Sequence, residues 1–91
     1  MKKTKMCFLV HESPYGPDVF AYFVDEIADY EGNHTSYAHI GQHSACCIEY
    51  AKESRQAKHS EYLPLFNELR SIGYHIEVVS KGRAGLCEIY L

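Results

Sequence analysis

The sequence predicts an α+β fold: an antiparallel sheet of about five strands with two helices on one face, in the chain order βββααββ. Two observations lead to this prediction. Most apolar segments are short and are bounded by Gly, Pro or Asn, which is typical of strands. One longer segment, residues 61–72, repeats its apolar residues at the helical period. The 91 residues show no repeat and no low-complexity tract, so we expect residues 1–91 to form a single domain.

The first half of the chain predicts three strands. Met6–His11 is apolar and is followed by ESPYGP, whose prolines and glycine predict a turn. Asp18–Asp25 is apolar on both faces, which is typical of a central strand, although its period alone leaves a helix open. After a loop with Gly32 and Asn33 at its tip, His34–Ile40 predicts a third strand.

The first helix is expected directly after the third strand. Gly41 interrupts that strand, and the hydroxyl of Ser44 can cap a helix over residues 45 to about 53, because it can accept an N–H of the first turn. The inward face of this helix would consist of Ala45, Ile48 and Ala51.

The second helix, from about Glu61 to Ile72, is the clearest element in the sequence. Its period predicts that Leu65, Leu69 and Ile72 face the sheet. Gly73 is placed to end this helix, because glycine readily adopts the left-handed conformation found just past a helix C-terminus. The last two strands are predicted over Ile76–Val79 and Leu86–Tyr90, with the loop KGRAG between them.

The distribution of charge argues against a nucleic-acid partner. No Lys or Arg lies between Lys5 and Lys52, whereas seven acidic residues do. A broad phosphate-binding surface needs clustered basic side chains, so we expect no nucleic acid and interpret the acidic half as a solvated face.

The apolar runs are too short for a membrane span of ~18 residues, so we expect no membrane partner. Met6–Val10, behind the basic N-terminus, is also shorter than the ~7–15 apolar residues of a signal peptide. We therefore expect a cytoplasmic protein with mostly reduced thiols at Cys7, Cys46, Cys47 and Cys87.

The stretch HIGQHSACC, residues 39–47, holds the candidate functional residues. His39, His43 and Cys46 are ligand types that zinc accepts, with Cys47, His34 or His11 as a fourth. This spacing matches no known zinc finger, so metal binding is the minority hypothesis, and we expect no cofactor.

Two further chemistries fit the same stretch. If Ser44 caps a helix, Cys46 and Cys47 lie in its first turn, where the helix dipole stabilises a thiolate and His43 could act as a base. Alternatively, Gly41, Gln42, His43 and Ser44 form a local hydrogen-bonded site that meets a ligand at the helix N-terminus.

The segments FAYF, SYAHIGQHSACCIEYAKESR and LFNELRSIGY resemble a family of short, uncharacterised bacterial proteins that are often met in mobile or accessory genomic regions. The resemblance extends from about Val19 to Val79. It implies no activity, cofactor or catalytic residue. Where those relatives open the second helix with Thr-Pro-Glu-Glu-Tyr, this chain has KHSEY, which lacks the usual cap.

The function that we expect is that of a small binding and interaction module, acting through a protein partner or as a homodimer. Strand edges present unpaired backbone groups, and the eight tyrosines suit an interface, so both favour association. We assign no catalytic residue. The alternatives are a zinc-type metal-binding protein that uses His39, His43 and Cys46, and a small thiol-dependent enzyme.

Overall fold

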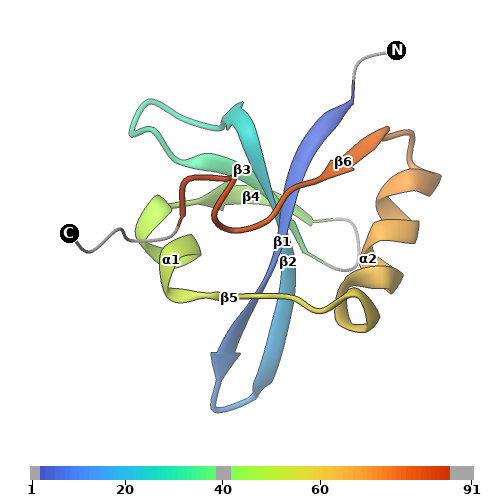
Figure 1. The fold of residues 1–91 in the computed structure, drawn as a ribbon. Helices are drawn as coiled ribbons and strands as arrows, with labels where there is room; N and C mark the ends of the chain where they lie inside the picture. Colours follow the sequence, from blue (N-terminus) through green and yellow to red (C-terminus); the bar gives the residue numbers. More distant parts are fainter. Residues whose placement is uncertain (1–2, 39–41, 87–91) are drawn as a thin grey trace.

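The computed structural model describes residues 3–38 and 42–86, with the side chain of Gln42 left out. These residues form an α+β fold of six strands and two helices (Figure 1). In chain order the elements are β1 (Thr4–Ser13), β2 (Gly16–Ile27), β3 (His34–Ala38), β4 (Gln42–Cys46), α1 (Ile48–Glu53), β5 (Arg55–Gln56), α2 (His59–Ser71) and β6 (Ile76–Val78).

β1 and β2 form a long antiparallel hairpin, with Ser13 paired to Gly16. The turn between them is tighter than the ESPYGP segment suggests, because only Pro14 and Tyr15 separate the strands. Gly16 has a φ of 113°, a backbone conformation that residues other than glycine rarely adopt. The Ser13 hydroxyl donates to the Gly16 carbonyl at 2.8 Å and accepts from the Tyr15 N–H at 3.2 Å. The predicted turn is confirmed, and the strands extend further than expected.

The sheet runs in the order β4-β3-β2-β1-β5, and β6 also pairs with β1. Two short strands therefore share one edge of β1: β5 is antiparallel to it near Leu9 and Val10, and β6 is parallel to it near Thr4 and Met6. The sheet is antiparallel apart from β6. The sequence did not predict the parallel pairing of β6 with β1. β4 forms the opposite edge.

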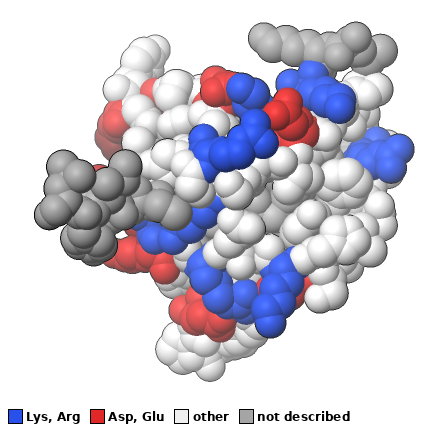
Figure 2. Space-filling view, viewed as in Figure 1, with Lys and Arg blue, Asp and Glu red and all other residues white. Residues whose placement is uncertain are grey.

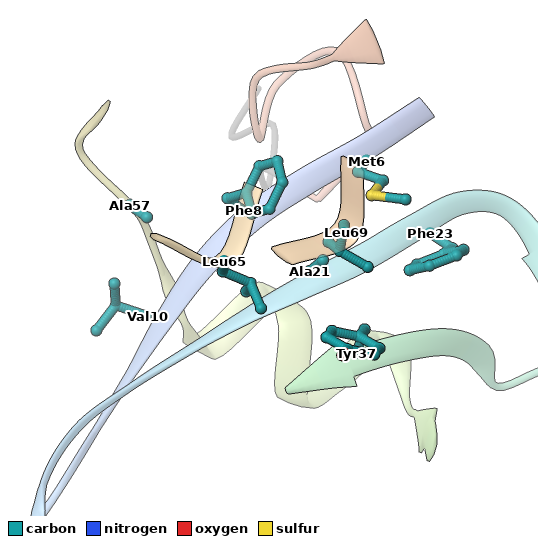
Figure 3. Close-up of a cluster of buried hydrophobic side chains, with 9 residues drawn as sticks. All are labelled: Met6, Phe8, Val10, Ala21, Phe23, Tyr37, Ala57, Leu65 and Leu69. Atoms are coloured by element: carbon teal, nitrogen blue, oxygen red, sulfur yellow. The ribbon is translucent and has the colours of Figure 1, made fainter. Parts of the chain in front are cut away.

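The two helices cover opposite faces of the sheet, so the expectation of two helices on one face is wrong. Leu65 and Leu69 of α2 pack on the face of β1 that carries Met6 and Phe8 (Figure 3). Ala51 of α1 packs on the other face. Side chains alternate between the faces of a strand, and the apolar run of β1 supplies core residues to both.

α2 begins at His59, two residues before its predicted start. Leu65 and Leu69 are buried as predicted, but Ile72 is 53% exposed, so its predicted inward position is wrong. Gly73, with a φ of 112°, ends the helix as expected. The N–H of Gly73 donates to the Arg70 carbonyl and that of Tyr74 to the Leu69 carbonyl, the two bonds of a Schellman motif.

The predicted helix over residues 45–53 is wrong in its first part. Gln42–Cys46 is a strand, and α1 begins only at Ile48, with Cys47 as its N-cap. The element order is therefore ββββαβαβ instead of βββααββ. β6 confirms most of the strand predicted over Ile76–Val79, and the KGRAG segment forms turns. Of the last predicted strand only Leu86 is described; it is buried and not part of a strand.

Candidate functional site

β4 places its side chains alternately on the two faces of the sheet. It pairs antiparallel with β3, with Tyr37 opposite His43 and Ser36 opposite Ser44. His43 contacts the rings of the cluster under α2, whereas Cys46 packs in the cluster under α1. Residues an odd number of positions apart on a strand point to opposite faces. His43 and Ser44 therefore do not form one local site, and the GQHS corner predicted at a helix N-terminus is wrong.

A groove of about 870 Å³ extends from the face of β2, β3 and β4 that is turned toward α1 to the first turns of α2, which covers the opposite face. On the α1 side it is lined by residues of the three strands and of α1: Asp18, Phe20, Ser36, Ser44, Cys46 and Tyr50. On the α2 side it is lined by Glu61, Pro64 and Leu65. Small side chains on β3 and β4 leave this space, because Ser36, Ala38 and Ser44 cannot fill the volume beside α1.

Two hydroxyl groups lie side by side in the groove. The oxygens of Ser36 and Ser44 are 3.0 Å apart, and Ser36 also donates to the Ser44 carbonyl at 3.3 Å. Ser36 is buried, and Ser44 is exposed. A hydroxyl offers one donor and two acceptor lone pairs, so this pair retains capacity to accept hydrogen bonds from a ligand.

Aromatic rings form the wall of the groove at α1. Tyr50 stacks on His11 with a centroid distance of 4.3 Å and lies 5.5 Å from the ring of Phe20. Partial burial raises the pKa of Tyr50, and the nearby Asp18 carboxylate adds to this because it disfavours a second negative charge. Asp18 and Tyr50 both belong to the groove lining.

On the opposite face, His43 belongs to a second cluster of polar and aromatic groups. Its Nε2 shares a 2.9 Å hydrogen bond with the Tyr74 hydroxyl, and its ring meets that of Tyr37 edge-on at 4.8 Å. The Tyr37 hydroxyl donates to a carboxylate oxygen of Glu68. Sequence reasoning missed Tyr37, Glu68 and Tyr74, because residues 31 positions apart meet only through the sheet and α2.

The structure does not bring the proposed metal ligands together. His43 and Cys46 lie on opposite faces of β4, and His39 and Gly41 are outside the described residues. The described part of the chain contains no group of three His, Cys, Asp or Glu side chains that could hold a metal ion.

The three residues named as a fourth metal ligand have other neighbours. His34 bonds the Phe23 carbonyl at 2.9 Å, and His11 stacks on Tyr50. The Sγ of Cys47 accepts the Tyr50 N–H at 3.4 Å.

Neither cysteine of the predicted thiol site lies in the first turn of a helix. Cys46 is a buried strand residue, and burial raises the pKa of its thiol to about 11, with the adjacent Cys47 adding to the effect. Cys47 is exposed and caps α1. A thiol with a raised pKa is a weak nucleophile at neutral pH, since the thiolate is the reactive form.

Basic side chains are spread over the surface seen in Figure 2, with acidic ones among them. Within the described residues, no helix combines the length and apolar character that crossing a bilayer requires. Comparison with protein-family models, with curated proteins and with solved structures gave no significant match. The resemblance to short bacterial proteins stays a prediction.

Proposed function

We propose that the protein is a small interaction module that acts by strand addition at the outer edge of β4, through a second copy of the chain or an extended segment of a protein partner. One observation carries the proposal. Within the described residues, β4 pairs with β3 only, whereas the edge of β1 is covered by β5 and β6. An open edge presents a row of backbone donors and acceptors to another strand.

The side chains of β4 support this proposal. Edge strands are commonly protected from association by Lys, other charges or Pro. β5 carries Arg55 and β6 carries Glu77, but the sequence of β4, QHSAC, contains no Asp, Glu, Lys, Arg or Pro. Its exposed residues His43, Ser44 and Ala45 are small or planar, so they permit close approach of another backbone.

A second copy is the simplest partner. Two β4 strands related by a twofold axis pair antiparallel, and each copy then satisfies the open edge of the other. Because β4 carries no Asp, Glu, Lys or Arg, the pairing brings no like charges of these side chains together at its centre.

The test is to place a charge on the edge. Ala45→Lys adds an exposed ammonium group to β4, and the matched control Ala28→Lys adds the same group in the loop after β2. Light scattering should give a dimer mass for the wild type and for Ala28→Lys at micromolar concentrations, and a monomer mass for Ala45→Lys.

Hydrogen exchange at the backbone of β4 provides an independent readout. In a dimer, the outward N–H groups of β4 should be protected, and the protection should be lost in Ala45→Lys. A monomer mass for the wild type over the whole concentration range, with fast exchange in β4, would contradict self-association. Equal masses for the two lysine variants would show that any dimer forms elsewhere.

A further inference from the structure

We propose that the groove between α1 and the sheet binds a small organic cation with an aromatic or aliphatic body, of the arylalkylammonium class. This proposal does not require strand addition at β4, although Ser44, Ala45 and Cys46 of that strand also line the groove. The volume of the groove, about 870 Å³, falls within the roughly 300–1,000 Å³ typical of small-molecule sites.

The charge of the lining selects a cation. The described lining residues include two carboxylates, Asp18 and Glu61, and no Lys or Arg. Arg55 donates hydrogen bonds of 2.8 and 2.7 Å to Glu61 and one of 2.7 Å to Glu12. Asp18 takes part in none of the ion pairs formed by the described residues. Its carboxylate is therefore a negative charge of the lining without a basic partner, which attracts a cation and repels an anion.

The rings beside Asp18 suit the same ligand. Phe20 and Tyr50 line the groove with their centroids 5.5 Å apart, and Asp18 lines the same groove. An ammonium group placed there would meet a carboxylate and the electron-rich face of an aromatic ring together. The apolar body of the ligand would lie along Phe20 and the small residues of β3.

The hydroxyl pair lies further along the sheet. Ser36 pairs with Tyr22, four residues along β2 from Asp18, so the hydroxyl groups of Ser36 and Ser44 would lie beside the body of the ligand and not at its ammonium group. A carboxylate or phosphate placed beside Asp18 would have no basic partner in the described lining.

The experiment compares three probes of nearly the same shape: 2-phenylethylammonium, the neutral 2-phenylethanol and the anionic 3-phenylpropionate. Each is titrated into the full chain, and amide shifts are followed by NMR. We expect saturable shifts at Phe20, Ser36, Ser44 and Tyr50 with the ammonium probe, about fivefold weaker binding of the alcohol, and no saturation with the anion.

Variants at two aspartates locate the charge effect. Asp18→Asn should weaken binding of the ammonium probe about fivefold, to the level of the alcohol. Asp25→Asn makes the same change on β2 outside the groove lining and should leave the affinity unchanged. Both residues are exposed, and equal melting temperatures would confirm that both variants fold.

Three results would overturn the proposal. The first is the absence of saturable shifts in groove residues with the ammonium probe. The second is equal affinity for the cation, the alcohol and the anion. The third is an equal affinity of the wild type and Asp18→Asn for the ammonium probe.

Discussion

Leu69 lies on the side of α2 that packs against the sheet and is completely buried in the cluster with Met6, Phe8 and Phe23. Truncation of a buried leucine removes its packing contacts and leaves a cavity. We expect Leu69→Ala to lower the free energy of unfolding by about 2–5 kcal/mol, measured by urea denaturation.

Ile72 supplies a control on the same helix. It follows the last turn of α2 and is 53% exposed, so Ile72→Ala should change the free energy of unfolding by less than about 0.5 kcal/mol. A loss for Ile72→Ala as large as that for Leu69→Ala would place the inward face of α2 one turn further along.

The two adjacent cysteines should differ in reactivity. Burial raises the pKa of Cys46 to about 11, whereas Cys47 is exposed at the N-cap of α1. In a Cys87→Ser background at neutral pH, iodoacetamide should alkylate Cys47 first, and Cys46 should react quickly only as the pH approaches 11. Fragment masses distinguish the two sites.

Cys47→Ser is the matched control for this experiment, because a serine oxygen can also cap a helix. The variant should remain folded and lose the fast reaction. Fast alkylation of Cys46 at neutral pH in this variant would contradict the assignment and would favour the thiol-enzyme alternative.

At the scale of the element, the start of α2 is fixed by a carboxylate. Glu61 accepts two hydrogen bonds from Arg55 and one of 2.9 Å from the Lys58 N–H. The hydrogen bonds from Arg55 and then from the Lys58 backbone lower the pKa of Glu61 from 4.5 to about 2. The Glu61 contribution to stability is therefore complete above pH 4.5 and is lost as the pH falls through about 2.

We therefore expect Glu61→Gln to lower the melting temperature at neutral pH. As the pH falls from 4.5 to about 2, the melting temperatures of the variant and the wild type should become equal. The loss should be modest, because water screens this exposed ion pair. Glu53→Gln is the control, since Glu53 is exposed and belongs to none of the described ion pairs. Thermal unfolding followed by circular dichroism measures both variants, and equal losses would contradict the assignment.

The elements that sequence predicts best are those specified by their own residues. The Schellman end of α2 follows from Gly73, and the hairpin turn follows from the Pro and Gly residues around Tyr15. β4 was missed because QHSAC resembles a helix start, with Ser44 as a capping residue. The pairing of β4 with β3 makes this segment a strand, and the local sequence does not show that partner.

The candidate site was predictable only in part, for the same reason. Ser44 and Cys46 do line the groove, but Asp18 and Tyr50 join them through the sheet order and the path of α1. Because residues 42–46 form a strand, the side chain of His43 lies on the opposite face from the side chain of Ser44, and there it shares a hydrogen bond with Tyr74. An error in one element thus divides the predicted site between two faces.

At the scale of the whole molecule, each face of the sheet has its own apolar cluster, one with α2 and one with α1. Since the described residues of each cluster pack through their own side chains, we expect a chelator to leave the melting temperature unchanged. Calorimetry with and without EDTA, together with metal analysis of the purified protein, tests this. Stoichiometric zinc lost together with the fold would contradict it, since a structural zinc contributes folding energy outright.

β1 precedes the other described elements but gains its last neighbours late, because β5 and β6 come from the second half of the sequence. A nascent chain that ends before them exposes Met6–Val10, an uncharged segment whose side chains are at most 2% exposed in the finished fold. Such segments tend to pair with other chains when uncovered. We therefore expect β1 to be the segment most exposed to aggregation before β5 and β6 have been synthesised.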